Sequence, residues 1–352
     1  MYQQRLFESL GTHFPSTRYQ GSKAKLVEWI WAQIGDLDFT TVLDAFGGTG
    51  VVSYRLKQEG KSVTYNDILR FNQQFALALI ENDNVLVRPQ DRAWVLTRHV
   101  HIDYPTFVED TFHNIYFTDD ENRWIDQTIR NIREITNPYR KTLLFFALAQ
   151  ACIVKRPYNL FHRKNLYMRL ADVERSFGNK ASWDRPFAEW FHSFLDEANQ
   201  AVFPGERRSQ AICGDIADLS GAYDLVYIDP PYISQRGVAV DYADFYHFLE
   251  GLCIYDEWKE QIDWKSKHRR MVRQTNLWND KSQIYAAFDS CFKLFADSIL
   301  VVSYRSDGIP SIDELRSLMA KYKSDVRVAV FGDYTYTLST NKRSQEVLLI
   351  GA

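Results

Sequence analysis

The sequence lacks paired or clustered cysteines. Its four cysteines are widely spaced and form neither a CxxC pair nor a cluster with histidine. This spacing argues against a zinc site and against a disulfide framework. We therefore expect reduced, buried thiols and no bound metal at Cys152, Cys213, Cys253 and Cys291.

An excess of positive charge is also absent. The formal net charge is -3 and the pI is about 6.3, so a nucleic-acid partner would have to be met by a local basic patch. Residues 1–20 lack the basic start and apolar run of a signal peptide, and no stretch is long and apolar enough to span a bilayer. These absences predict a cytoplasmic protein that does not bind membranes.

The composition is typical of a globular protein. Hydrophobic residues make up 45% of the 352 residues and charged residues 25%, so the chain can bury a substantial core. The aromatic share of 15% is high. Most of these rings are expected in the core, although such residues also supply stacking surfaces.

The first part of the chain follows an α/β pattern. Helical periodicity over 23–34 is followed by a buried strand with a glycine turn over 40–48, a helix over 50–60 and a second strand over 61–68. A strand, a tight turn, a helix and a strand form a βαβ unit. This unit predicts a parallel sheet with its ligand at the carboxyl ends of the strands.

The α/β pattern returns after residue 209. QAICGDI and YDLVYIDPPY are expected to be two adjacent strands, followed by a helix over 281–296, a strand over 298–308, a helix over 311–322 and an antiparallel closing pair, RVAVFG and QEVLLIG. The middle has few strand signals, so we expect a mainly helical insertion that reads the target sequence. The predicted fold is α/β, a Rossmann-like sheet with helices on both faces, divided into 1–84, the insertion 85–204 and 205–352.

The segment DAFGGTG predicts a ligand site. Asp44 ends a strand, and Gly47, Gly48 and Gly50 permit a tight turn in which backbone can approach a ligand. Asp67 ends the next strand, where a carboxylate can bind ribose hydroxyls. A structural turn and a nicotinamide site are the alternatives. The turn continues as VVS, so the third glycine of the dinucleotide-binding pattern GxGxxG is missing. An adenosine ligand without pyrophosphate, such as S-adenosylmethionine, has less need of the complete glycine loop.

A second site is predicted where the apolar strand LVYI runs into DPPY. Pro230 and Pro231 fix φ and lack an N–H, so the turn is stiff. The Asp229 carboxylate and the Pro230 carbonyl are two acceptors that suit a planar amino group, and Tyr232 offers a ring for stacking. For DP alone, a structural Asx or proline turn is the alternative.

Two acceptors on one exocyclic amino group favour a particular chemistry. Such a group is a poor nucleophile, because its lone pair is delocalised into the ring. When both N–H bonds are held, the lone pair can point at an electrophilic methyl group. Attack is then direct and in line, without a covalent enzyme intermediate.

Three motifs carry a resemblance to a known family: TRYQGSK at 17–23, DAFGGTG at 44–50 and, after a long insertion, DPPY at 229–232. In this order they resemble the DNA adenine-N6 methyltransferases of the alpha group, which include the Dam methylase and many restriction-modification enzymes. The resemblance covers both α/β blocks. It implies transfer of a methyl group from S-adenosylmethionine to N6 of adenine in double-stranded DNA, and it raises a cognate restriction endonuclease as a partner.

The resemblance also implies roles for single residues. Tyr19 would pack beside the cofactor, Lys23 would hold its methionine carboxylate, Asp67 its ribose and Asp215 its adenine. Asp229, Pro230, Pro231 and Tyr232 would form the catalytic group that grips the target adenine. The other cofactor contacts would come from Asp44, Phe46, Gly47, Gly48, Gly50 and Asp229.

Adenine in a duplex lies beyond the reach of a recessed pocket, so the base must be flipped out, which costs about a few kcal/mol. Two basic runs are candidates for DNA contact, with a solvated helix face as the alternative for each. The segment 233–280 is long for a connection, so we expect it to form a flap. The candidate residues are Lys155, Arg156, Arg163, Lys164 and Arg169 in 154–169, and Lys267, Arg269 and Arg270 in 265–276.

Other functions stay open at this point. Cytosine-N4 enzymes usually carry Ser at the position of Asp229, and glutamine-modifying enzymes Asn, so the resemblance favours adenine. RNA stays open as a substrate. A catalytically silent DNA-binding subunit should have lost the acid or the aromatic ring, and both remain. A nicotinamide dehydrogenase is disfavoured by the incomplete glycine fingerprint and by the lack of an evident histidine-centred catalytic group.

Overall fold

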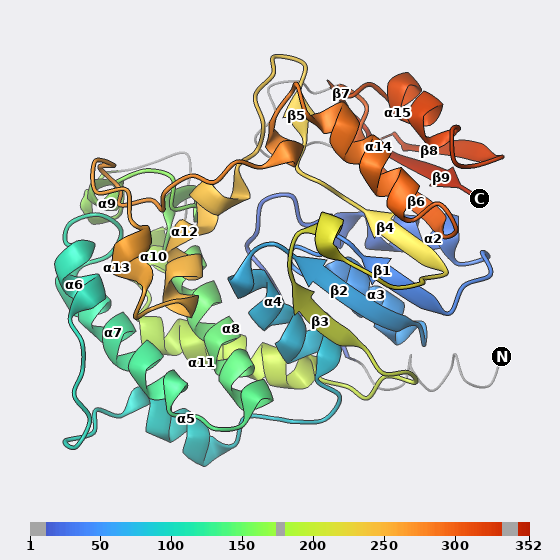
Figure 1. Cartoon of the computed structure of the whole chain (residues 1–352). Coiled ribbons are helices and arrows are strands. Elements are labelled where there is room, and N and C mark those ends of the chain that lie inside the picture. Colours follow the sequence, from blue (N-terminus) through green and yellow to red (C-terminus); the bar gives the residue numbers. More distant parts are fainter. Residues whose placement is uncertain (1–11, 174–179, 333–343) are drawn as a thin grey trace. The chain divides into compact units, whose positions relative to one another are not determined.

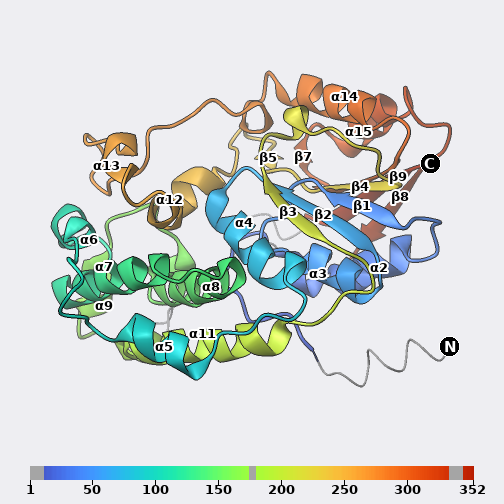
Figure 2. The ribbon, with the colours of Figure 1, turned by 60° about the horizontal axis from the view of Figure 1, so that its bottom comes forward.

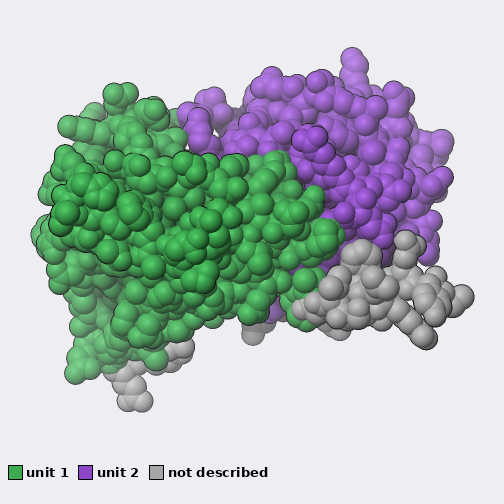
Figure 3. Space-filling model, turned by 90° about the horizontal axis from the view of Figure 1, so that it is seen from below, with its two compact units in different colours: residues 1–19, 77–204, 243–273 green, residues 20–76, 205–242, 274–352 purple. Residues whose placement is uncertain are grey.

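The computed structural model describes residues 12–173, 180–332 and 344–352. They form two compact units, which Figure 3 shows in different colours. The sheet unit comprises the described residues within 20–76, 205–242 and 274–352. The helical unit comprises those within 1–19, 77–204 and 243–273.

The helical unit differs from the expected insertion in three places. It includes the described residues of 1–19, its main segment begins at residue 77 rather than 85, and it includes 243–273, which we expected in a flap of the core. Aromatic packing is the reason. Phe248 lies parallel to Phe161 with ring centroids 5.1 Å apart, and Trp258 contacts Phe112 at 5.0 Å. These four side chains are fully buried, so the segment belongs to the core of this unit.

Seven strands of the sheet unit form one sheet in the order β3-β2-β1-β4-β6-β9-β8 (Figure 1). Neighbouring strands are parallel except at β9, which is antiparallel to both β6 and β8. The expected Rossmann-like sheet and its antiparallel closing pair are therefore confirmed. The strands are β1 (Thr41–Asp44), β2 (Ser62–Asp67), β3 (Gln210–Cys213), β4 (Leu225–Ile228), β6 (Ile299–Arg305), β8 (Val326–Phe331) and β9 (Glu346–Gly351), and β5 (Ile233–Ser234) pairs separately with β7 (Gly308–Ile309).

One expected neighbour relation is wrong. β3 and β4 follow each other along the chain, but β2 and β1 lie between them in the sheet. Burial explains the order: all four residues of β4 are buried, as in a central strand, whereas β3 exposes Gln210 and Cys213 at the edge. The strand order reverses between β1 and β4, and open α/β sheets bind ligands at the carboxyl ends of the strands beside such a reversal.

Helices cover both faces of the sheet, with α2 and α3 on one face and α14 and α15 on the other (Figure 2). In α14 the buried residues Ile284, Phe288 and Phe292 repeat every four positions and form one apolar face. This face lies in the same core as Val226 of β4 and Leu300 of β6. The helices of this unit are η1 (Lys23–Lys25), α2 (Val27–Ile34), α3 (Val51–Gln58), α4 (Arg70–Ala76), η4 (Ile216–Asp218), η5 (Leu277–Asn279), α14 (Ile284–Leu294) and α15 (Ile312–Met319).

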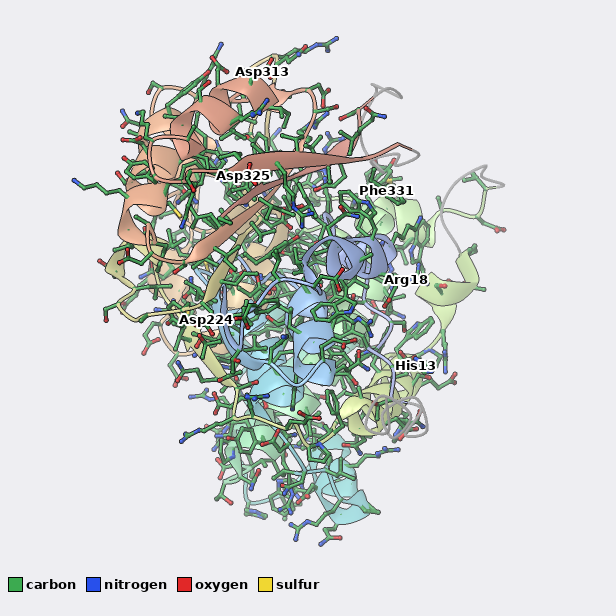
Figure 4. All side chains as sticks on the ribbon, turned by 90° about the vertical axis from the view of Figure 1, so that its right-hand side faces the viewer. His13, Arg18, Asp224, Asp313, Asp325 and Phe331 are labelled. Carbon is green, nitrogen blue, oxygen red and sulfur yellow. The ribbon has the colours of Figure 1, made fainter. Side chains whose placement is uncertain are left out.

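The amino ends of the two central strands are held by Asp224, which precedes β4 (Figure 4). Its carboxylate accepts hydrogen bonds from the backbone N–H groups of Thr40 and Thr41, each at 2.8 Å. The Asp224 N–H donates to Oγ1 of Thr41 at 3.0 Å. This acid therefore has a structural role, at the opposite strand ends from the predicted ligand site.

The helical unit is built around α8 (Pro138–Val154), in which every residue from Thr142 to Val154 is buried. A helix that is apolar on all sides belongs at the centre of a bundle, and α7 and α11 pack against it. The described residues between 77 and 204 form helices and loops without a strand, which confirms the mainly helical middle. No helix in the described ranges combines the length and apolarity of a membrane span. The other helices are η2 (Leu77–Glu81), α5 (Pro89–Leu96), α6 (Phe107–Thr111), α7 (Asp119–Arg133), η3 (Pro157–Asn159), α9 (Leu166–Leu170), α10 (Lys180–Asp184), α11 (Phe187–Ala201), α12 (Tyr242–Cys253, except its first residue) and α13 (Trp258–Gln261).

The four cysteines are free thiols. Cys152 and Cys291 are buried as expected. The expectation is corrected for Cys253, which is half-buried, and for Cys213, which is exposed at the end of the edge strand β3.

Candidate active site

The turn after β4 folds back on its own acid. Asp229 follows four buried strand residues and keeps 15% of its side chain exposed. Pro230 is buried and Pro231 half-buried, and both rings restrict the backbone. The hydroxyl of Tyr232 lies 2.9 Å from Oδ1 of Asp229. The turn therefore holds its acid and its tyrosine as one group.

The ring of Tyr232 packs into the sheet unit. Its side chain is 9% exposed, and its ring lies almost perpendicular to that of Tyr304, with centroids 5.1 Å apart. Hydrogen bonds thus fix the hydroxyl of Tyr232, and packing against Tyr304 fixes its ring. The expected stacking of this ring on a base stays a prediction.

Lys23 joins the turn from η1. Its ammonium lies 2.8 Å from each carboxylate oxygen of Asp229 and donates to the Tyr232 hydroxyl at 2.6 Å. A second acid, Glu346, lies 3.6 Å from the same ammonium. A buried cation needs such partners to offset its lost hydration. The expected contact with a methionine carboxylate stays a prediction, and the structure places Lys23 beside the predicted catalytic acid.

Glu346 was missed in the sequence analysis. It is the first residue of β9 and is fully buried. Its Oε1 accepts a hydrogen bond from the Ser303 hydroxyl at 2.5 Å and lies 2.9 Å from the Tyr232 hydroxyl. The available signal was a single acid at the start of the apolar strand EVLLIG, because a carboxylate inside such a strand must find partners.

Burial and charge set the proton affinity of Asp229. Burial raises the pKa of its carboxyl to about 6, the ammonium of Lys23 opposes this rise, and the charge of Glu346 adds to it. At neutral pH the group is then mainly a carboxylate that can accept hydrogen bonds. It is also a better proton acceptor than an ordinary aspartate.

In the glycine turn after β1 the backbone comes close to a side chain of β2, and the expected approach of a ligand stays a prediction. Gly48 and Gly50 have φ angles of 52° and 82°, in the left-handed region that favours glycine. A Cβ on Gly47 would lie 2.0 Å from the ring of Tyr65. The Tyr65 hydroxyl donates to the Gly48 carbonyl at 2.7 Å. Tyr65 was not singled out from the sequence, since an aromatic residue in a buried strand is usually only core.

Asp67 holds the same turn from the end of β2. Its carboxylate accepts hydrogen bonds from the N–H of Gly48 at 2.9 Å, the N–H of Leu69 at 2.8 Å and the amide of Asn72 at 3.1 Å. Burial raises the pKa of Asp67 to about 6, although these bonds oppose the rise. Its observed role is to fix the turn, and the ribose contact stays a prediction.

Asp44 carries an oxygen that has no partner among the described residues. Its Oδ2 accepts a hydrogen bond from the Ser53 hydroxyl at 2.6 Å, while Oδ1 is buried and unpaired there. Burial raises the pKa of Asp44 to about 7. A buried acceptor beside a glycine cradle fits a ligand that brings a hydrogen-bond donor. Phe46 in the same turn packs edge-on against Trp278, with centroids 4.8 Å apart.

Two other predicted cofactor residues have local partners. Tyr19 belongs to the helical unit and stacks on Tyr246, with centroids 4.6 Å apart and an interplanar angle of 8°. Asp215 is exposed and caps η4, where it accepts a hydrogen bond from the N–H of Ala217 at 2.9 Å. Their contacts with a cofactor stay predictions.

Three of the predicted DNA-binding residues are buried cations with partners inside the helical unit. Lys155 is 2% exposed and pairs with Glu121 at 2.9 Å. Arg169 pairs with the same carboxylate at 2.7 Å. Arg156 is 1% exposed and donates to the Tyr116 carbonyl at 3.0 Å. These charges are paired with a partly buried acid and with backbone carbonyls, and contact of these residues with DNA stays a prediction.

The other five predicted DNA-binding residues differ in exposure. Arg269 is half-buried and donates to the Trp264 carbonyl at 2.8 Å, and Arg270 pairs with Asp263 at 3.2 Å. The three exposed residues of this group are Arg163, Lys164 and Lys267.

A doubly wound sheet with a glycine turn after β1 and an acid-proline-proline-tyrosine turn after β4 defines the class of Rossmann-like methyltransferases. Residues 19–304 match the sequence model of the D12 class N6 adenine-specific DNA methyltransferases, and the chain belongs to this family. It is therefore an enzyme that methylates adenine N6 in DNA and needs a methyl donor. The family confirms the expected methylation of adenine N6 in DNA, and it decides for adenine over cytosine and for DNA over RNA.

Curated relatives agree with this assignment. The chain is 29% identical over 345 residues to the type II methyltransferase M2.HphI of Haemophilus parahaemolyticus, with 96% of this chain and 97% of that protein covered. It is 24% identical over 355 residues to the modification methylase LlaI of Lactococcus lactis subsp. lactis (94% and 52% covered). It is 23% identical over 341 residues to the type II methyltransferase M.FokI of Planomicrobium okeanokoites (87% and 47% covered). The chain thus spans almost all of the first relative and about half of the other two.

Proposed function

We propose that the enzyme moves the methyl group of S-adenosylmethionine to an adenine flipped out of double-stranded DNA at a short recognised sequence, with Asp229 holding the target amino group. One observation carries this proposal. The Asp229 carboxylate sits on a stiff turn at the carboxyl end of a central strand, 2.8 Å from the ammonium of Lys23 and 2.9 Å from the hydroxyl of Tyr232. Such a fixed acceptor is what a planar amino group needs for orientation.

The glycine turn supports S-adenosylmethionine as the methyl donor. Gly48 and Gly50 give the turn a backbone conformation that favours glycine, and the Asp44 oxygen that is unpaired among the described residues can accept a hydrogen bond from the ligand. Asp67 and Asp215 would meet the ribose and the adenine, as the family resemblance implies. When bound, S-adenosylmethionine supplies an electrophilic methyl group on a sulfonium.

The residues of the turn would then act on the target adenine. Asp229 accepts one N6–H bond and the Pro230 carbonyl the other, so the N6 lone pair turns out of the ring plane toward the methyl group. The N6–C bond forms as the C–S bond breaks, and the electron pair of that bond stays on sulfur. N6 then carries an excess proton. Asp229, whose pKa burial raises to about 6, can take this proton and pass it to water.

Contact with DNA would come from exposed cations. Arg163 and Lys164 precede α9, and Lys267 lies in the second basic run, 265–276. Such side chains bind phosphates and position a duplex, and flipping of the base would be offset by these contacts and by stacking on Tyr232. The names of the relatives add a proposal that a restriction endonuclease of the same specificity accompanies the enzyme.

Base flipping can be measured separately from catalysis. A duplex with 2-aminopurine at the target adenine should become strongly fluorescent when enzyme and sinefungin are added, because the unstacked base is no longer quenched. The same duplex with 2-aminopurine two positions away is the matched control. Equal fluorescence of the two duplexes would refute flipping of the target base.

A further inference from the structure

A second acid lies in the cluster around Asp229 without a role in the proposed reaction. Glu346 is fully buried at the start of β9, and its polar neighbours include Ser303, Tyr232 and Lys23. The carboxylates of Asp229 and Glu346 thus both lie near the ammonium of Lys23. Burying an extra carboxylate costs free energy, and a well-packed apolar residue often stabilises a fold as well or better. A purely structural role is thus a poor explanation for this charge.

We propose that Glu346 is a positioning residue for methyl transfer, which fixes the Asp229 carboxylate through the Tyr232 hydroxyl and the Lys23 ammonium. This inference rests on the proposed role of Asp229. Glu346 itself touches neither the target base nor the methyl donor in this scheme.

The geometry gives a continuous path from the sheet to the catalytic acid. The Ser303 hydroxyl on β6 donates to Oε1 of Glu346 at 2.5 Å, and this oxygen lies 2.9 Å from the Tyr232 hydroxyl. The hydroxyl lies 2.9 Å from Oδ1 of Asp229. Because β6 and β9 are paired in the sheet, the path begins on rigid backbone.

The Tyr232 hydroxyl has one proton, which it can give to only one of the two acids at a time. Lys23 donates to this oxygen at 2.6 Å and lies near both acids. When an adenine amino group donates to Asp229, the tyrosine proton can move to Glu346 without loss of a hydrogen bond. Glu346 would thus keep the hydroxyl satisfied while Asp229 engages the substrate.

The charge of Glu346 also affects the proton affinity of Asp229. The charged and titratable groups that face Asp229 are Lys23 from η1, Glu346 from β9, Tyr232 from its own turn, Tyr227 from β4 and Asp44 from β1. Burial is the main cause of the raised pKa of Asp229, and Glu346 adds to the rise. Without this charge, Lys23 would act on Asp229 alone and the pKa of Asp229 should fall.

Two substitutions separate the effect of the Glu346 hydrogen bonds from the effect of its charge. Glu346→Gln keeps an oxygen that can accept from Ser303 and Tyr232 but removes the charge. We expect its kcat at pH 8 to stay near that of the wild type, while the acidic limb of its kcat profile moves to lower pH. Glu346→Ala removes the hydrogen bonds as well, and kcat should fall by roughly tenfold to a hundredfold, with little change in KM for DNA or for S-adenosylmethionine.

Rescue of the alanine loss by glutamine, together with the displaced acidic limb, supports the inference. A glutamine variant whose acidic limb coincides with that of the wild type overturns it, and this readout remains if the alanine variant does not fold. An alanine variant with wild-type kcat overturns it as well. Asp229→Ala is assayed in parallel: if it keeps its turnover, the proposed function itself fails, and if it is inactive while the Glu346 variants are unchanged, only the role of Glu346 fails.

Discussion

The ammonium of Lys23 lies 2.8 Å from the carboxylate of Asp229, although 206 positions separate the two residues in the sequence. The motif near the start of the chain and the turn after β4 therefore form one charge cluster. The positive charge favours the ionised form of Asp229, and burial opposes it. The balance leaves the pKa of Asp229 raised to about 6.

Replacement of Lys23 by methionine should change the balance between charge and burial that sets the pKa of Asp229. Without the ammonium, burial and Glu346 act on Asp229 unopposed, so the pKa of Asp229 should rise and the acidic limb of kcat should move to higher pH. If Lys23 also holds the carboxylate of the methyl donor, binding of S-adenosylmethionine should weaken by about 1 to 3 kcal/mol. Titration calorimetry and a pH series of kcat measure the two effects.

The matched control is Lys25→Met, since Lys25 is an exposed lysine of the same short helix. It should behave like the wild type in both assays. An unchanged acidic limb for Lys23→Met would contradict the electrostatic role of the Lys23–Asp229 pair.

Asp44→Asn should stabilise the fold and weaken the binding of the methyl donor. The pKa of Asp44 is raised by burial from the ordinary value of 3.8 to about 7. The folded state therefore binds this proton more tightly than the unfolded state, and stability is lost as pH rises from about 4 through 7. Asparagine removes this loss. The gain in Tm over the wild type should be largest above pH 7 and should fade toward pH 4, with about 2 to 4 °C for each kcal/mol.

The control for Asp44 is Asp36→Asn at an exposed position, which should leave the pH dependence of Tm unchanged. Calorimetric scans from pH 4 to 8 make the comparison. A Tm difference for Asp44→Asn that is the same at every pH would show that the carboxyl does not titrate as stated.

Gly47→Ala should damage the cofactor turn. The added Cβ would lie 2.0 Å from the ring of Tyr65, and the turn or the ring must move, at about 1 to 3 kcal/mol. We expect a lower Tm and a loss of S-adenosylmethionine affinity. Gly332→Ala is the control, since among the described residues its Cβ would meet the Gln345 side chain at 3.9 Å, an ordinary contact distance. A wild-type Tm and wild-type affinity in Gly47→Ala would contradict the close packing of Gly47 against Tyr65 and its effect on the cofactor turn.

The fold was accessible from the sequence because its signals are local. The strand before DAFGGTG, the helix after it and the strand ending at Asp67 each show their own periodicity. Local signals also led us to expect β3 and β4 to be adjacent, which was wrong. The position of a strand in a sheet depends on which strands are buried on both faces. This is a property of the whole core, and neighbours in sequence do not report it.

The site was only partly accessible. The two turns could be found, because proline and glycine restrict the chain wherever they occur. Glu346 could not be placed, since its partners lie on other elements of the sheet unit. The burial of Lys155 and Arg169 could not be foreseen either. A basic residue looks the same in sequence whether it faces solvent or an acid such as Glu121.

The difference between exposed and buried basic residues can be tested by measuring DNA binding and stability. Arg163→Ala and Lys164→Ala should each reduce the slope of log Kd against log salt concentration by about 1, without a change in Tm, if each contacts one phosphate. Lys155→Met and Arg169→Met should instead lower the stability by about 1 to 3 kcal/mol, because each leaves Glu121 with one partner fewer. A wild-type salt slope in both exposed variants would exclude the 154–169 run from the DNA contact.

The most direct test of the central claim is a map of modified bases on plasmid DNA treated with the wild-type enzyme and with Asp229→Ala. The claim is that the turn after β4 holds an adenine amino group on Asp229 for methyl transfer. We expect N6-methyladenine at one short sequence with the wild type and none with the variant, which should stay folded because Lys23 keeps Glu346 and the Tyr232 hydroxyl as partners. Methylation at cytosine N4, or N6-methyladenine at wild-type levels with Asp229→Ala, would contradict the claim.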